Sequence, residues 1–169
     1  MKFIITFWLL LLYAEGKAQL CIECHSRKTL NFNLLKKEGL RIDTTAIRTD
    51  GVYVMNIKDS TKHTVSYFFY RFFKNGRVYM SCEYCSYPTD VEFNDLRYGH
   101  YGQYRVESAN KLKIEAHELP LGYQYQFFDI NGDWITYQFY MSRNSKDIQS
   151  MPPFSYHFKK VPLDSKSFW

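Results

Sequence analysis

The sequence predicts an all-β protein, an up-and-down antiparallel barrel of about eight strands with one or two short helices. Two segments rich in Tyr and Phe are each interrupted by Asn-Gly, once at Asn75-Gly76 and once at Asn131-Gly132. Asn-Gly suits the two positive φ angles of a type I′ turn, so each segment is expected to form a two-stranded hairpin. A third segment, residues 112–117, alternates apolar and polar side chains, which is the period of a strand with one buried face.

Short connections separate the expected strands, which is typical of an up-and-down barrel. Within the second hairpin, alternate positions are expected to share one face, namely Ile135, Tyr137, Phe139 and Met141. The strands are expected at Gly51–Ile57, on both sides of Asn75 within Thr64–Tyr84, at Tyr98–Glu107, at Leu112–His117, on both sides of Asn131 within Tyr123–Met141, and at Phe154–Val161.

Two short helices are expected outside the strands. The first covers Asn31–Glu38 and ends at Gly39, a residue that suits a helix C-terminus. The second covers Asp90–Leu96, with Thr89 or Asp90 as the N-cap. Its apolar contacts are expected to be Val91, Phe93 and Leu96.

The N-terminus has the pattern of an export signal. Lys2 precedes a short apolar run, residues 3–13, and Gly16 and Ala18 supply the small residues of a cleavage site. We therefore expect a signal peptide at 1–18, a leader with the first cysteine pair at 19–46, the barrel at 47–161 and a C-terminal tail at 162–169. The mature protein is expected to be periplasmic or secreted. It should meet a membrane only during export and have no transmembrane helix.

Four segments resemble the small exported lipocalin-like proteins of Gram-negative bacteria. They are IRTDGVYV (47–54), YRFFKNGRV (70–78), YGQYRVESANKLKI (101–114) and FSYHFKKV (154–161). The resemblance covers roughly residues 47–161 and implies a calycin-type, lipocalin-like barrel, usually without a known activity.

The four cysteines form two Cys-x-x-Cys pairs, Cys21/Cys24 and Cys82/Cys85. In an oxidising compartment such cysteines favour disulfides, and we expect bridges between the two pairs. Two alternatives remain open. Four thiolates can hold zinc, and Cys21-Ile-Glu-Cys24-His25 also spells a c-type haem attachment site. Because disulfides are favoured, no metal and no cofactor is expected.

A two-residue loop at Asn75-Gly76 would pair Arg71 with Met80 and direct both into the barrel, where Arg71 would bind a ligand carboxylate. In the alternative register, Arg71 faces water while Phe68, Tyr70 and Phe72 face inward. Three tyrosines interleaved with glycines, Tyr98, Tyr101 and Tyr104, either rim a pocket or simply pack. The candidate pocket residues are Tyr53, Tyr67, Phe69, Arg71, Met80, Tyr104, Tyr137 and Phe139.

Other signals of catalysis are weak. The chain has neither His-Glu-x-x-His nor Gly-x-Ser-x-Gly, so hydrolases have no local support. Asp129–Asp133 is better explained by a hairpin turn than by a calcium loop. Glu115 and Glu118 are expected to be solvated charges on a strand.

These observations together favour an exported, non-enzymatic barrel that binds a small apolar or amphipathic ligand or a protein partner. The aromatic content of 19% supports this expectation, because aromatic rings fill small barrels and line their cavities. The net charge of +5 is mild and its basic residues are scattered, so nucleic acid is not an expected partner. The alternatives are an outer-membrane β-barrel, or a haem- or metal-binding exported protein that uses the cysteine pairs.

Overall fold

Nine strands and one short helix make up the part of the chain that the computed structural model describes, which is residues 32–34, 46–97, 99–118, 122–144, 148–150 and 153–164. The protein is therefore all-β, as the sequence predicts. In chain order the elements are β1 (Gly51–Asp59), β2 (Thr64–Phe72), β3 (Arg77–Ser81), α2 (Asp90–Asn94), β4 (Gly99–Ser108), β5 (Lys111–Glu118), β6 (Gly122–Asn131), β7 (Trp134–Ser142), β8 (Ile148–Ser150) and β9 (Ser155–Lys160).

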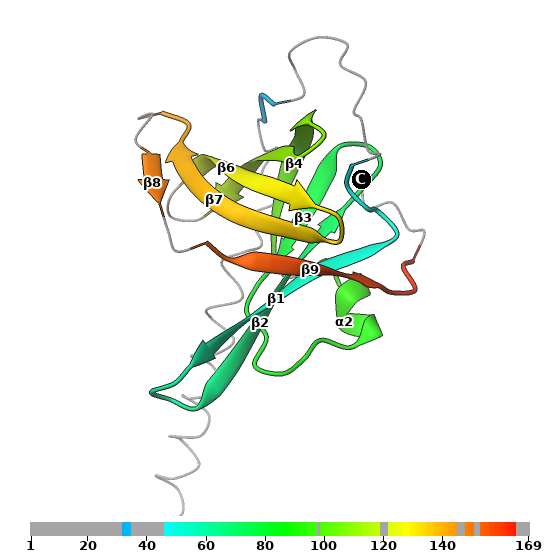
Figure 1. The fold of residues 1–169 in the computed structure, drawn as a ribbon. Coiled ribbons are helices and arrows are strands. Elements are labelled where there is room, and N and C mark those ends of the chain that lie inside the picture. The colour runs from blue at the N-terminus through cyan, green and yellow to red at the C-terminus, as the bar shows by residue number, and fades with distance from the viewer. Residues whose placement is uncertain are drawn as a thin grey trace, which may run out of the picture.

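Eight of these strands form a closed antiparallel barrel. From β1 to β7, each strand pairs with the next one in the sequence. Strand β9 lies between β1 and β7 and pairs with both (Figure 1). The β6–β7 hairpin completes the ring, and β8 lies outside it, paired only with β7. The predicted up-and-down barrel is confirmed, and closure removes the open edges that a flat sheet would expose.

The β2–β3 turn differs from the predicted two-residue loop. Phe72 pairs with Val78, and the Phe73 N–H donates to the Arg77 carbonyl oxygen over 2.9 Å, which leaves a three-residue loop. Gly76 has a φ of 80°, whereas Asn75 has no positive φ. A type I′ turn needs positive φ at both residues, so the chain instead adopts a longer loop with only its last residue in the left-handed region. The expected pairing of Arg71 with Met80 is therefore wrong by one residue.

The β6–β7 hairpin shows a similar shift. Asn131 pairs with Trp134, so the two loop residues are Gly132 and Asp133, and only Gly132 has a positive φ, of 57°. This is the pattern of a type II′ turn, which needs glycine at its first central position only.

A β-bulge in β7 changes which side chains face the barrel interior. Phe127 pairs with Phe139 but the next residue, Phe128, pairs with Tyr137, so Gln138 is an extra residue. A bulge of this kind moves the following side chains to the opposite face. Tyr137 therefore belongs to the interior cluster, while Phe139 stacks on Phe127 outside it, and the expectation of one shared face is wrong.

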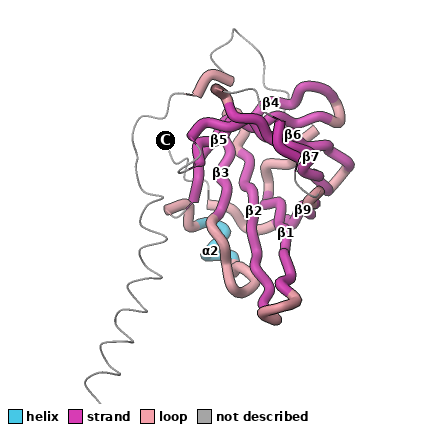
Figure 2. Tube along the Cα trace, turned by 90° about the vertical axis from the view of Figure 1, so that its left-hand side faces the viewer, coloured by secondary structure: helices cyan, strands magenta, loops and turns pink. Residues whose placement is uncertain are grey.

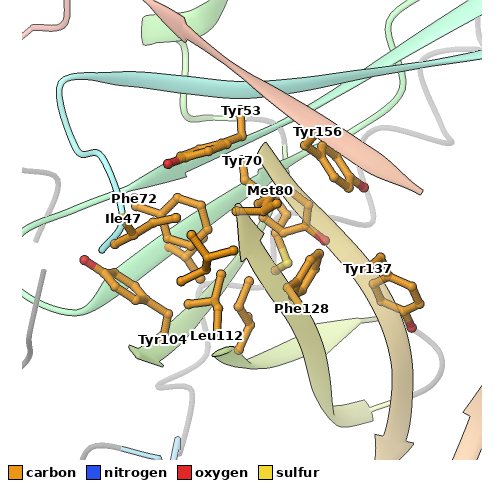
Figure 3. Close-up of a cluster of buried hydrophobic side chains, with 14 of the residues drawn as sticks. Ile47, Tyr53, Tyr70, Phe72, Met80, Tyr104, Leu112, Phe128, Tyr137 and Tyr156 are labelled. Carbon is orange, nitrogen blue, oxygen red and sulfur yellow. The ribbon is translucent and has the colours of Figure 1, made fainter. Parts of the chain in front are cut away.

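Two apolar cores lie on opposite faces of the barrel wall. The interior core contains, among others, Tyr53, Tyr70, Phe72, Met80, Tyr104, Phe128, Tyr137 and Tyr156 (Figure 3). The second core lies outside the wall and contains Val52, Phe69, Tyr79, Phe93, Leu96 and Val161. Strand β2 contributes to both cores, because Tyr70 and Phe72 face inward while Phe69 faces outward.

Helix α2 covers the outer core, and Figure 2 shows it outside the barrel wall near β2 and β3. Thr89 is its N-cap and forms a capping box with Glu92, which confirms this predicted helix start. Phe93 is fully buried against Phe69, but Val91 is 78% exposed, so its expected apolar contact is wrong. The other predicted helix, Asn31–Glu38, lies mostly outside the described residues, and residues 32–34 are not helical.

Candidate functional site

The eight candidate pocket residues divide equally between the two faces of the barrel. Tyr53, Met80, Tyr104 and Tyr137 face the interior, as predicted. The other four lie outside it. Phe69 belongs to the outer core, Tyr67 contacts Tyr87, Phe139 stacks on Phe127, and Arg71 lies under the C-terminal segment.

One end of the interior is filled by interlocked aromatic rings. The Tyr53 ring meets those of Phe72 and Phe158 edge-on, with ring centres 5.6 and 5.3 Å apart. Phe72 in turn meets Tyr104 at 4.9 Å, and Figure 3 shows Tyr53, Phe72 and Tyr104 together. The Tyr104 hydroxyl donates to the Phe73 carbonyl oxygen over 2.9 Å. Burial raises the pKa values of both tyrosines, so these phenols stay protonated and act as packing groups.

Arg48 closes this end from outside. Its guanidinium lies 3.8 Å from the centre of the Phe158 ring and forms ion pairs with Asp50 and Asp133. Its backbone N–H donates to the Tyr53 hydroxyl over 3.1 Å. These contacts fasten the chain before β1 to the β6–β7 turn.

The opposite end of the interior is more polar. Gln124 and Gln126 on β6 point inward and are only 3% and 5% exposed, and the Tyr70 hydroxyl lies 3.1 Å from the Gln126 amide oxygen. Half-buried Phe68 and Tyr140 pack against the interior core at this end. Longer connections, including residues 82–98, also join the strands here. Buried amides beside half-buried rings make this end the candidate binding site.

The two glutamines were not among the predicted site residues. The run Tyr123-Gln-Tyr-Gln-Phe127 alternates perfectly, and alternation normally directs the apolar side chains inward. Here the direction is reversed, since Ala116 opposite Gln124 is fully buried in the interior while Tyr125 and Phe127 lie outside. The alternation along residues 123–127 was the available signal. It divides the side chains between two faces of the strand but does not show which face lies inside the barrel.

Arg71 occupies neither predicted position. It is 4% exposed, yet it lies on the outer face of β2, where its Nη1 and Nη2 donate to the Asn94 Oδ1 (3.1 Å) and to the Asp164 carbonyl oxygen (3.0 Å). Its Nε is buried without a hydrogen-bond partner, and burial lowers the pKa of the guanidinium. Arg71 thus holds residues 162–164 against α2, and its expected role inside the barrel is wrong.

Glu115 is also placed differently from the prediction of a solvated charge. It is completely buried on the outer face of β5. The backbone N–H groups of Asn33 and Leu34 donate to its Oε2 over 2.7 and 2.6 Å, and Arg143 donates to its Oε1 over 3.0 Å. The side chain of Glu118 lies outside the described residues. We call Glu115, Arg143 and residues 32–34 the carboxylate clamp.

The cysteine predictions remain partly outside the described residues. Cys82 is partly exposed and Cys85 is exposed just after β3, with no disulfide between these two. Cys21 and Cys24 lie outside the described residues, so the predicted bridges between the pairs stay a prediction. Within the described ranges, no group of three or more His, Cys, Asp or Glu side chains is arranged to hold a metal ion.

We expect the four cysteines to be oxidised in pairs across the chain after export. Intact mass spectrometry of protein from an oxidising compartment should give a chain that starts at Gln19 and lacks four hydrogens relative to its reduced form. Such bridges would be worth about 4 kcal/mol in the chain-entropy model, because they close long loops. Added mass equal to haem, or four alkylatable thiols with bound zinc, would contradict both the pairing and the absence of a cofactor.

A scan of family models and searches of curated proteins and of solved structures find no match to this chain. The function proposed below therefore rests on the side chains of this protein alone. In the described ranges, the chain contains no helix with the length and apolar character needed to cross a membrane.

Proposed function

We propose that this protein is an exported, non-enzymatic barrel of the lipocalin-like type that binds a small amphipathic ligand in the polar end of its interior. The observation that carries the proposal is the pair of buried amides, Gln124 and Gln126, on the inner face of an otherwise aromatic and aliphatic lining. Binding pockets commonly combine a mainly apolar lining with a few inward polar groups that orient the ligand.

The arrangement suits a ligand with one polar and one apolar part. Toward the middle of the barrel, Met55, Met80 and Phe68 offer flexible and aromatic surface to an apolar chain. The polar groups lie at the other end, where the Tyr70 hydroxyl donates to the Gln126 amide oxygen and Gln124 lies on the same face of β6.

Filling the polar end should remove binding. Ala116 is fully buried and lies opposite Gln124, so the ring of Ala116→Phe would project into the space that the ligand is proposed to occupy. We expect wild type to enhance the fluorescence of the neutral probe N-phenyl-1-naphthylamine and Ala116→Phe to show at least a tenfold weaker effect. If the ring enters the space proposed for the ligand, urea unfolding of the same variant should show little loss of stability.

The matched control is Ser108→Phe, an exposed change at the far end of β4 that should leave probe binding unchanged. If the interior is filled throughout, wild type will not enhance the probe. Ala116→Phe will then cost about 1–3 kcal/mol through overpacking. That result would reject the small-ligand proposal.

A protein partner is the second candidate, and a different surface favours it. Phe127 and Phe139 stack at 4.5 Å on the outside of the barrel and are only half-buried, with the Lys113 ammonium 5.2 Å from the centre of the Phe127 ring. Aromatic side chains are enriched at protein interfaces relative to the rest of the surface. This surface is independent of the polar interior, so the probe experiment separates the two candidates.

A further inference from the structure

We infer that the outer face of the barrel around β1 and β9 binds an extended, acidic segment of a partner protein, which adds to the open edge of β1 as a further strand. This inference goes beyond the proposed function, because the surface lies outside the barrel wall and does not include Phe127 or Phe139. Two independent observations carry it, namely a band of exposed rings and ammonium groups, and an open strand edge beside that band.

The first observation is a band of side chains that crosses the outer faces of β7, β9, β1 and β2. Trp134 is 47% exposed, and its ring centre lies 4.5 Å from that of exposed His157, which pairs with Val54 of β1. Across β1, Tyr87 is 46% exposed and meets Tyr67 of β2 edge-on at 5.3 Å. Trp and Tyr are enriched among the residues that dominate binding at protein interfaces. Together with two lysines, these rings form what we call the outer band: Trp134, His157, Lys159, Tyr87, Tyr67 and Lys58.

The two lysines give the outer band a positive charge. The Lys159 ammonium lies 4.6 Å from the centre of the Tyr87 ring. Lys58 is exposed, and the alternation along β1 places it on the same face as Val54, which packs against the outer core. Cations beside exposed rings suit a partner that presents carboxylates together with apolar or aromatic groups.

Acidic side chains at the two ends of the outer band are engaged within the protein and leave this charge in place. At the Trp134 end, Asp133 forms an ion pair with Arg48. At the Tyr67 end, Glu83 accepts a hydrogen bond from the Ser66 hydroxyl. The negative charge that complements the band is therefore expected from a partner.

The second observation is the open edge of β1. Strand β9 pairs with β1 only over Gly51–Val54, and in the described ranges no strand pairs with residues 55–59 on that side. Figure 1 shows the β1–β2 hairpin extending beyond β9. The backbone groups of such an edge can pair with an additional strand, which only a polypeptide can supply. The edge therefore favours a protein segment over a glycan, a nucleic acid or a lipid surface.

Lys58 determines which kind of strand this edge accepts. A lysine on an edge strand normally discourages pairing with other chains. A carboxylate directly opposite converts the same lysine into one member of a cross-strand ion pair. The edge thus opposes a neutral or basic strand and accepts an acidic one.

The experiment measures binding of a fluorescein-labelled random copolymer of glutamate and tyrosine by fluorescence anisotropy. The wild-type protein should bind it at low salt at least tenfold more tightly than it binds a lysine–tyrosine copolymer, an oligodeoxythymidine or vesicles of phosphatidylglycerol. Binding should weaken at least fivefold at about 1 M salt, where the Debye length falls to about 3 Å. Amide hydrogen exchange within residues 55–59 should slow in the complex, which contacts made by side chains alone would not cause.

Three variants test the outer band. Trp134→Ala should weaken copolymer binding at least tenfold, and Lys58→Gln and Lys159→Gln roughly two- to fivefold each. Lys74→Gln is the matched control, since it removes the same charge from an exposed position in the β2–β3 loop and should bind as wild type does. Trp134 and Lys58 are exposed, so their substitution should leave the urea midpoint near that of wild type.

The inference is overturned if the lysine copolymer, the oligodeoxythymidine or the vesicles bind as tightly as the glutamate copolymer, or if none of these probes binds. It is also overturned if Trp134→Ala and Lys159→Gln both bind as wild type does, or if exchange within residues 55–59 is unchanged. Ala116→Phe, which blocks the proposed interior site, should leave copolymer binding intact, so failure of the proposed function and failure of this inference are distinguishable. The wild-type comparison needs no variant, so it holds even if a variant does not fold.

Discussion

Replacing Gly51 by alanine is expected to destabilise the protein by about 3 kcal/mol or more, because it forces apart the two strands that close the barrel. A Cβ at position 51 would lie 2.2 Å from the Lys159 carbonyl oxygen and 2.6 Å from a carbon of the Phe158 ring. Gly51 pairs with Lys160 in the β1–β9 ladder, so the backbone oxygen cannot move aside without breaking that ladder. Urea unfolding of the purified variant measures the change.

Gly132→Ala is the control for this experiment. Gly132 has a positive φ of 57°, but an added Cβ would meet nothing within 4 Å. Its substitution should cost only about 1–2 kcal/mol, the usual penalty for a left-handed residue that is not glycine. Equal losses at the two positions would show that β9 accommodates the new Cβ and that its close approach does not explain the need for Gly51.

Replacing Glu115 by alanine should cost about 3 kcal/mol and release residues 32–34 from the barrel. The change leaves two backbone N–H groups and the Arg143 guanidinium without their acceptor, and breaking a buried ion pair typically costs 3–5 kcal/mol. We expect the lower end of that range because the Arg143 side chain is 21% exposed and can regain water. Urea unfolding gives the energy, and amide hydrogen exchange at Asn33 and Leu34 reports the release.

Glu107→Ala provides the comparison for a surface charge. Glu107 forms an exposed ion pair with Arg105 at 2.6 Å, and such pairs contribute about 0.5 kcal/mol or less. Unchanged exchange at both amides in Glu115→Ala would mean that apolar contacts, such as the edge-on meeting of Phe32 with Tyr123, hold the segment in place of the carboxylate clamp.

Local patterns were sufficient to predict the all-β class and the strands of the barrel, but not β8, which lies in a segment that reads as a loop. Turn residues and alternation located the strands, and Thr89 with Glu92 located the start of α2. They could not predict register, because the difference between a two-residue and a three-residue loop at Asn75-Gly76 depends on one φ angle. The apolar residues of β2 could not identify its inner face either, because both faces of this strand are buried.

This double burial also affects how a substitution would be interpreted. Phe69 is 1% exposed and Phe68 is half-buried, so Phe69→Ala would be the more damaging change. Yet Phe69 lies outside the barrel, under α2, and Phe68 faces inward. If the larger loss of stability were taken to mark the ring that faces inward, comparison of Phe69→Ala with Phe68→Ala would indicate the wrong register.

The candidate site was harder to predict than the fold because its members depend on distant parts of the chain. In the sequence, Glu115 looks like an ordinary charged residue of an alternating strand. In the structure it is buried and accepts a hydrogen bond from Leu34, which lies 81 residues earlier in the chain. Gln124 alternates with tyrosines that would normally be the buried partners, and only the pairing of β6 with β5 and β7 shows that the amide points inward. Neither relation is encoded within a short window of sequence.

The insertion of β9 between β1 and β7 has a consequence for the order of folding. A chain made or exported from its N-terminus produces β1 first and β9 last, so β1 has only β2 as a neighbour until the final strand arrives. Pairings between residues so far apart in sequence form slowly, and until then the outer edge of β1 is open to pairing with other chains. The pairing of β1 with β9 at Gly51 therefore determines when the barrel becomes complete. It also determines how long the nascent protein needs protection from self-association.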